Sequence, residues 1–247
     1  MELRCEMGQH LSEAERSVID YINKQRYIIS LLSISDIAEG AFVSNATVSR
    51  AIRKCGFSSF SEMKFRLAES ENEDRDAYKM NRILSMSYTE CMETIKRIDI
   101  PSIIESVRLI REAKVVYLLA NGLTALQAEE FKFQLQCQKI NVCMISDAQM
   151  MKRMDLLVTE QDLVIIISVK NSAPELAEAA KLSRKKGAKV ISFCCTHGTL
   201  LDSLSDFCIY GYTQSICPNE LFGATSRLGL MIITRTVVEY MMTGPVS

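Results

Sequence analysis

The stretch ISDIAEGAFVSNATVSRAIRKCGF, residues 34–57, predicts two short helices joined by a tight turn. In its first half, apolar residues recur at helical spacing and form one stripe: Ile34, Ile37, Ala38 and Ala41. Gly40 falls where this first helix should end, because glycine takes a left-handed turn without steric cost.

The second helix of this stretch should begin after the N-cap Ser44 and run to about Cys55, where Gly56 stops it. Val48, Ala51 and Ile52 can face inward, and Asn45, Thr47, Ser49, Arg50, Arg53 and Lys54 then face outward. Small hydrogen-bonding side chains thus come first along the helix and cations last, which suits a recognition helix. In that role, bases or nearby phosphates would be contacted by Ser44, Asn45, Thr47 and Ser49. Phosphates would mostly be contacted by Arg50, Arg53 and Lys54. The alternative is an ordinary helix pair with a solvated basic face.

An earlier helix should pack against this pair. Ser12 as N-cap and Glu15 three residues later form a capping box. Val18, Ile19 and Ile22 follow at helical spacing and provide its apolar face.

Composition fits a globular chain of one large or two smaller domains, with 247 residues, 48% hydrophobic and 24% charged. The net charge of −1 is unusual for a protein that binds nucleic acid. Its distribution matters more than the sum. Between Ser44 and Leu67 five basic residues stand against one acidic residue, so positive charge concentrates on the second helix of the pair.

Cysteine and histidine usage narrows the compartment and the chemistry. The nine cysteines include no CxxC pair, which indicates reduced thiols and a cytoplasmic protein. His10 and His197 are the two histidines, which argues against a histidine-based zinc site, and we expect no cofactor. The N-terminal residues lack the pattern of a signal peptide, and no apolar run is long enough to span a membrane.

Residues 1–70 resemble the N-terminal domain of the RpiR/MurR family of bacterial transcription regulators. The matching motifs, in order, are Ser35–Ala38, Val43-Ser44, Ala46–Arg50 and Cys55–Phe57, followed by Phe60 to Leu67. The arginine directly after Thr-Val-Ser and the Gly-Phe close after the helix are the most specific. The resemblance implies a helix-turn-helix domain that binds double-stranded DNA.

From Ala113 onward the pattern predicts an α/β domain with a five-stranded parallel sheet flanked by helices, in flavodoxin-like layering. The expected strands are 115–119, 142–145, 163–167, 190–193 and 207–210, and the expected helices are 123–138, 149–157, 173–186 and a short one near Leu200. We place a linker at 71–85 and the second domain at 86–247. That domain should open with a helix over 86–98 and another that begins at Pro101.

Two loops after expected strands offer backbone N–H groups at helix N-termini to an anion, namely Ala120–Thr124 and Ser168–Pro174. With the strand order they make residues 86–240 resemble a SIS (sugar isomerase) domain, which in this family binds phosphorylated sugars that alter DNA affinity. The resemblance implies a ligand site at Asn121, Gly122, Thr124, Ser168, Lys170, Asn171 and Ser172. The family's Ser-x-Ser-Gly-x-Thr loop is altered here, because Lys170, Asn171 and Ala173 replace its second Ser, its Gly and its Thr.

The last segment, residues 220–242, should form a long apolar helix. It serves either as a subunit interface or as a core helix packed on both sides. We expect the interface, and therefore a homodimer or tetramer held by the SIS domain.

Catalysis is the competing function, because SIS-type sheets also occur in sugar-phosphate isomerases. An isomerase needs a general base, for which His197 and Glu220 are the candidates. The altered loop and the DNA-binding half favour a regulator of sugar metabolism over an enzyme. The third alternative is a dimerising scaffold without ligand.

Overall fold

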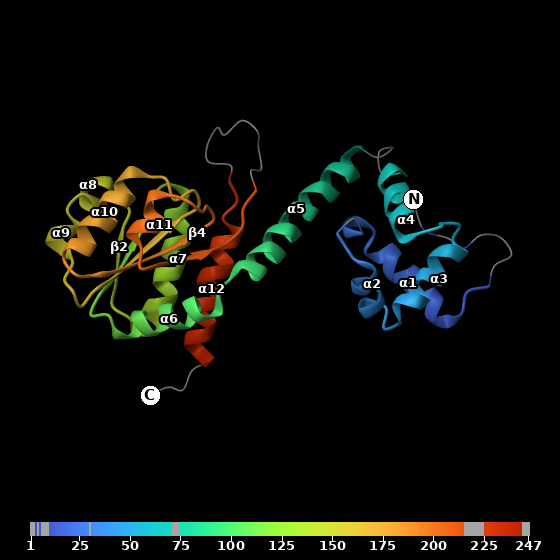
Figure 1. The fold of residues 1–247 in the computed structure, drawn as a ribbon, viewed down its shortest axis with the longest axis horizontal. Helices are drawn as coiled ribbons and strands as arrows, with labels where there is room; N and C mark the ends of the chain where they lie inside the picture. Colours follow the sequence, from blue (N-terminus) through green and yellow to red (C-terminus); the bar gives the residue numbers. More distant parts are fainter. Residues whose placement is uncertain are drawn as a thin grey trace. The chain divides into compact units, whose positions relative to one another are not determined.

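The computed structural model of the chain describes residues 3, 5, 10–29, 31–70, 75–214 and 225–243. The chain divides into two compact units, Met1–Thr89 and Glu90–Ser247, which we call the N-terminal unit and the C-terminal unit. Each is described by itself (Figure 1).

The N-terminal unit is built from short helices around one core. They are α1 (Glu13–Lys24), the 3-10 turn η1 (Arg26–Ile28), α2 (Ile34–Gly40), α3 (Asn45–Lys54) and α4 (Phe60–Ser70). α3 packs against both α1 and α2. The core contains Val18, Ile22, Ile37, Val48, Ile52 and Met63, all fully buried. Burial of each such side chain contributes roughly 1.5–3 kcal/mol. The predicted apolar faces of α1, α2 and α3 are confirmed.

Helix α5 (Arg75–Arg97) corrects the prediction of a helix that starts at 86, because it begins within the range 71–85 that we predicted as a linker. Residues 71–74 lie outside the described residues, but the chain is helical from Arg75 onward. The sequence from 75 to 97 contains no glycine or proline, so nothing interrupts the helix. One helix therefore runs through the boundary between the two units at Thr89 and Glu90.

The C-terminal unit contains a five-stranded parallel sheet in the order β2-β1-β3-β4-β5. The strands are β1 (Val116–Leu119), β2 (Val142–Ile145), β3 (Leu163–Ser168), β4 (Lys189–Cys194) and β5 (Phe207–Tyr210). Each agrees with its predicted range to within one residue at either end. Asp99 caps α6 (Ile100–Glu112), which has Pro101 in its first turn as expected.

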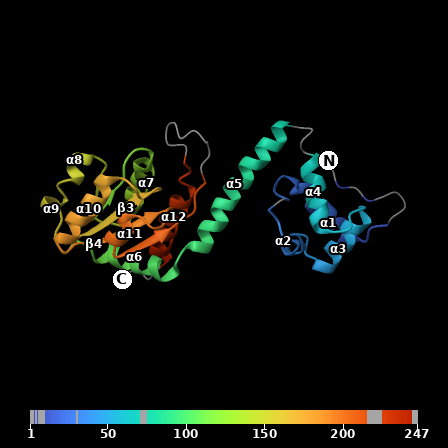
Figure 2. The same ribbon diagram turned by 45° about the horizontal axis from the view of Figure 1, so that its top comes forward.

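Helices cover both faces of this sheet (Figures 1 and 2). Leu163, Ile165 and Ile167 of β3 pack with α6, α7 (Leu123–Cys137) and α12 (Leu228–Thr243). Val164 and Ile166 point the other way and pack with the helices of the opposite layer. That layer consists of α8 (Ala148–Met151), α9 (Met154–Leu157), α10 (Pro174–Lys185) and α11 (Leu200–Leu204). Coverage on both faces explains why β3 is apolar at consecutive positions.

Two predicted helices of the C-terminal unit have different limits in the structure. The single helix expected over 149–157 is two short helices, α8 and α9, which break at Lys152 and Arg153. The helix expected over 220–242 begins at Leu228, whose N–H donates to Ser226 Oγ, and residues 220–224 lie outside the described residues. Within the part of the chain that the structure describes, no helix is long and apolar enough to cross a membrane.

Candidate functional site

Helix α3 has the ends and the inward face that the sequence predicts. Ser44 Oγ accepts a hydrogen bond of 3.2 Å from the Thr47 N–H, and Gly56 follows the helix with φ 86°. Val48, Ala51 and Ile52 are buried against the core of the unit. The opposite face of α3 carries exposed Asn45, Arg50 and Arg53 and half-buried Ser49, with exposed Ser44 just before the helix.

Two side chains expected on the outer face of α3 are held inward. Thr47 is only 8% exposed, and its hydroxyl lies 3.0 Å from Ser44 Oγ and accepts from Arg50 Nη2 at 3.1 Å. Lys54 Nζ lies 2.7 Å from Glu15 Oε2 and also donates to the His10 carbonyl oxygen. The Lys54 charge is therefore already paired within the unit, and Arg50 and Arg53 carry the outward positive charge of α3.

Glu15 is the buried carboxylate that connects α1 to α3. It completes the predicted capping box, since Oε2 accepts the Ser12 N–H at 2.8 Å while Ser12 Oγ accepts the Glu15 N–H. Arg50 Nε approaches the other oxygen at 3.8 Å. The hydrogen bond from Lys54, together with those from Ser12, lowers the pKa of Glu15 to about 2. Glu15 thus fixes the position of α3 on α1.

The turn between α2 and α3 is a Schellman motif, which corrects the role expected for Gly40. The Val43 N–H donates to the Ala38 carbonyl oxygen at 2.8 Å, and the Phe42 N–H donates to the Glu39 carbonyl oxygen at 3.1 Å. This pattern puts the left-handed residue two positions after Gly40, at Phe42, with φ 57°. A bulky residue there costs about 1–2 kcal/mol relative to glycine.

Gly40 is the last residue of α2 and serves packing instead. A Cβ at this position would lie 2.2 Å from Tyr21 Cζ, so the ring of Tyr21 needs the space that glycine leaves. The prediction that α2 ends at Gly40 is confirmed, but the reason for glycine at this position is packing and not a left-handed turn.

The second candidate site lies at the carboxyl edge of the sheet. The strand order makes β1 and β3 neighbours although α7 and β2 intervene in the chain, which is a topological switch point. The loops after these two strands therefore meet at one edge. Asn121 Nδ2 of the first loop donates to Glu175 Oε1 at the start of α10, at 2.6 Å. Gly122 precedes α7 with φ 56°.

The loop after β3 keeps a tight left-handed turn at Asn171, with φ 54°. The Asn171 N–H donates to Ser168 Oγ at 3.1 Å. Its side chain is 2% exposed, and Nδ2 donates to both Thr199 Oγ1 and Asp202 Oδ1 at 3.1 Å. The Asn171 Oδ1 atom is buried and has no hydrogen-bond partner among the described residues. Asn171 thus adopts a left-handed conformation that glycine takes without steric cost, and polar contacts hold it there.

The seven predicted ligand residues differ in how accessible they are at this edge. Gly122, Lys170 and Ser172 are exposed, Asn121 is half-buried, and Thr124, Ser168 and Asn171 are buried. The exposed ones can meet a ligand directly. The buried ones shape the two loops.

Asp202 is a residue of this edge that sequence reasoning missed. Besides Asn171, its carboxylate accepts hydrogen bonds from Thr199 Oγ1 at 2.5 Å, from the Gly198 N–H and from the Tyr210 hydroxyl. Burial alone would raise the pKa of Asp202, but these hydrogen bonds outweigh it and leave the pKa below its usual value. The spacing of Thr199 and Asp202, an N-cap residue and a carboxylate three positions later, was the available signal.

Of the two candidate bases for isomerase chemistry, His197 lies among the described residues. His197 is exposed, and its ring stacks on Tyr210 with the centroids 3.7 Å apart. Glu220 lies outside the described residues.

The segment after β5 is bound to the second half of α5. Thr94 Oγ1 accepts the Tyr212 N–H at 2.9 Å, and buried Glu90 Oε1 accepts the Gln214 N–H at 2.7 Å. The Arg97 guanidinium lies over the Tyr212 ring, 4.5 Å from its centroid. These contacts fix α5 to the strand that carries Tyr210.

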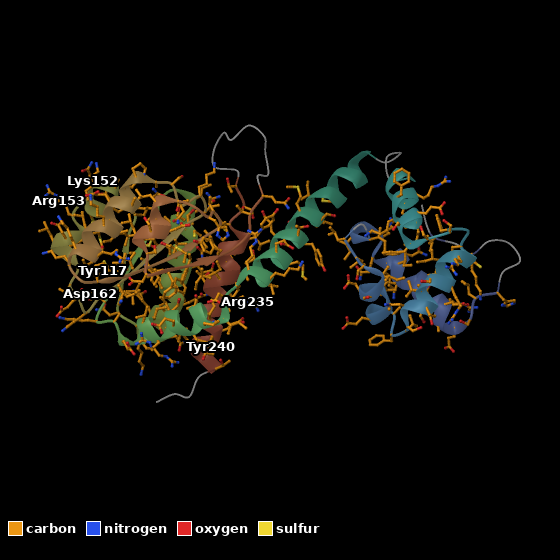
Figure 3. The ribbon with its side chains drawn as sticks, viewed as in Figure 1. Tyr117, Lys152, Arg153, Asp162, Arg235 and Tyr240 are labelled. Atoms are coloured by element: carbon orange, nitrogen blue, oxygen red, sulfur yellow. The ribbon has the colours of Figure 1, made fainter. Side chains whose placement is uncertain are left out.

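An apolar groove of about 540 Å³ runs between α7 and α12. Phe133, Met231 and Met242 line it and are all exposed. Arg235, which also lines it, and Tyr240 project from α12 (Figure 3). Leu230, Ile233 and Val237 of the same helix are fully buried in the sheet core. α12 therefore packs in the core on one side and leaves an apolar face on the other.

Comparison with known proteins agrees with both halves of the structure. Residues 3–74 match the helix-turn-helix domain of the rpiR family, and residues 109–237 match the SIS domain. The regulator HexR of Pseudomonas aeruginosa is 27% identical over 212 residues, which cover 81% of this chain and 74% of HexR.

Solved structures share the fold. The NanR protein of Vibrio vulnificus, complexed with ManNAc-6P, matches with a TM-score of 0.61 and 22% identity over 94% of this chain and 87% of NanR. A phosphoheptose isomerase from Francisella tularensis matches with a TM-score of 0.53 and 16% identity over 67% of this chain and 97% of the isomerase. A helix-turn-helix unit joined to a SIS domain defines a transcriptional regulator. The chain belongs to the rpiR family of these regulators.

Proposed function

We propose that this regulator binds operator DNA through α3 and that an anionic sugar derivative, most simply a sugar phosphate, modulates the binding from the carboxyl edge of the sheet. The observation that carries the first part is the outward face of α3, where Asn45, Arg50 and Arg53 are exposed at a helix whose other face is buried. Such a protein acts where the chromosome is, in the cytoplasm.

The chemistry of the carboxyl edge supports an anionic effector. α7 and α10 begin there, and among the described residues neither has a side-chain hydrogen bond at its N-cap position. Their first N–H groups and the positive ends of their dipoles are therefore available to an anion. Lys170 adds an exposed ammonium on the loop between β3 and α10. The NanR complex with ManNAc-6P provides a precedent for such a ligand in a protein of this fold.

Coupling between the two functions can pass along β5 to α5. Asn171 of the ligand loop is bound to Asp202, Asp202 is bound to Tyr210, and Tyr212 and Gln214 are bound to α5. α5 continues into the N-terminal unit as one helix. A ligand that shifts the loop would then bias the placement of α3, which is the differential interaction that allostery requires.

Replacement of Lys170 by alanine should abolish most of the thermal stabilisation produced by a sugar phosphate, because the ammonium is the full positive charge of the loop. The measurement is the melting temperature of the full chain with a panel of hexose and N-acetylhexosamine phosphates and with inorganic phosphate. Lys189→Ala is the matched control, since Lys189 begins β4 at the opposite edge of the sheet. A wild-type chain that no sugar phosphate stabilises would contradict the proposed effector.

The same proposal includes a homodimer, or a dimer of dimers, held by the C-terminal unit through α12. Met231→Glu should convert the assembly to monomers, because a carboxylate would enter the exposed apolar face beside Phe133. Analytical ultracentrifugation measures the mass, with Lys181→Glu on the exposed side of α10 as control. An unchanged mass would refute α12 as the interface.

Two other functions make different predictions. A sugar-phosphate isomerase would turn over the phosphates that bind, and a scaffold would bind neither DNA nor ligand. A gel-shift assay at low salt with the DNA upstream of its own gene separates the regulator from both alternatives, because only the regulator has to bind this DNA.

A further inference from the structure

We propose that Phe42 is a DNA-contacting residue that places its ring against the apolar parts of the duplex, the thymine methyl groups and deoxyribose, beside the N-terminus of α3. The inference rests on the proposed function, since it assumes that α3 meets DNA. Its basis is a conflict between the residue type, the backbone conformation and the exposure at this position.

The backbone at Phe42 calls for glycine. The flanking hydrogen bonds, from the Val43 N–H to Ala38 and from the Phe42 N–H to Glu39, fix the turn and force φ to 57°. The other described residues with positive φ that are not glycine are Lys139 and Asn171. Asn171 is held by two side-chain hydrogen bonds and belongs to a type that tolerates this conformation. Phe42 is the aromatic residue among these three.

Packing does not compensate for this strain, because the Phe42 side chain is 95% exposed. It adds nothing to the core of the N-terminal unit and leaves a large apolar ring in water. A residue that is strained and exposed at once stabilises nothing within the unit. Backbone strain of this kind is commonly retained at functional sites.

The position of Phe42 points to DNA as its partner. It lies two residues before Ser44, the N-cap of α3, and so at the end of the helix that the proposed function directs to base edges. Exposed polar Ser44 and Asn45 follow Phe42 at the start of α3, and Asn45 Nδ2 donates to Ser35 Oγ at 3.3 Å. The other large, exposed apolar side chains among the described residues of this unit lie on α4 and α5. A protein interface would require an apolar cluster around the ring, whereas a single ring among polar groups suits the edge of a groove.

The test compares Phe42→Gly, Phe42→Asn and Phe42→Trp in the full chain. The probe is the duplex that the wild-type chain enriches from a randomised duplex library. Glycine and asparagine should bind this duplex about tenfold more weakly, and tryptophan should bind within about threefold of wild type. In the same two weaker variants, hydrogen exchange of α2 and α3 amides should slow by roughly fivefold, because the backbone strain is relieved. A purely structural role would move stability and binding in the same direction.

Replacement of single thymines in the duplex by deoxyuridine identifies the contacted group. Weaker wild-type binding at one position, with no further loss in Phe42→Gly, assigns the contact to a thymine methyl. No such position, with Phe42→Gly still weaker, assigns it to deoxyribose. If Phe42→Gly binds as tightly as wild type, or changes the oligomeric state instead, the inference is wrong. If the wild-type chain enriches no duplex at all, the proposed DNA binding fails first.

Discussion

Replacement of both Arg50 and Arg53 by alanine should weaken operator binding by roughly 100-fold and flatten its dependence on salt. The two guanidinium groups carry the outward charge of α3, because Lys54 is held 2.7 Å from Glu15 whereas the Arg50 side chain, 3.8 Å from Glu15, stays 61% exposed. The slope of log K against log salt is negative, and each lost phosphate contact reduces its magnitude by about 0.9. Loss of both arginines should therefore make the slope less steep by about two for each α3. Fluorescence anisotropy with the enriched duplex at several salt concentrations measures both quantities.

The matched control removes the same charge from the same unit outside α3. Arg16 on α1 and Arg66 on α4 are exposed, and their double alanine variant should bind within roughly fivefold of wild type. Circular dichroism checks that both variants fold, because Arg50 also donates to Thr47 and forms an ion pair with Glu15. Unchanged affinity and slope in Arg50→Ala/Arg53→Ala would refute the assignment of α3 as recognition helix.

Lys54 shows why the sequence predicts the outer face of α3 only in part. Local signals predicted the limits of the helix, since Ser44 and Gly56 act on residues within one turn. The ion pair between Lys54 and Glu15 joins residues 39 positions apart. Helical periodicity places Lys54 on the outer face of α3 and Glu15 in line with Val18, Ile19 and Ile22 on the inner face of α1. It does not show that the two helices bring these residues together.

In the C-terminal unit, too, local features could be predicted from the sequence and long-range polar contacts could not. Its strands were predicted well because they are continuous apolar runs, and burial on both faces makes such runs distinctive. The loops 120–124 and 168–174 also follow β1 and β3, as predicted. The side chain of Asn171 is held by Thr199 and Asp202, and Asp202 in turn accepts from Tyr210 of β5, so this support depends on the packed sheet. Periodicity carries no information about such contacts.

Replacement of Glu15 by glutamine should destabilise the N-terminal unit by on the order of 2–3 kcal/mol at neutral pH. The folded-state pKa of about 2 lies well below the value of 4.5 for a free glutamate, and this difference is a stabilising free energy. Partial exposure of Lys54 screens the pair and keeps the effect below the full value. Hydrogen exchange of α1 and α3 amides in the full chain, corrected for intrinsic rates, should be faster by roughly 30-fold to 150-fold.

The pH dependence of stability distinguishes the contribution of the Glu15 charge from that of the size and shape of its side chain. Because its pKa is lower in the folded unit than in the unfolded chain, its contribution is complete above pH 4.5 and is lost as the pH falls toward 2. Wild-type protection of α1 and α3 should therefore decline over this range, and the Glu15→Gln variant should lack that part of the decline. Glu13→Gln is the control, since Glu13 is exposed in the same first turn and should change stability by less than about 0.5 kcal/mol. If Glu15→Gln and Glu13→Gln behave alike, the carboxylate does not hold α3 on α1. The orientation of α3 would then depend on the apolar core alone.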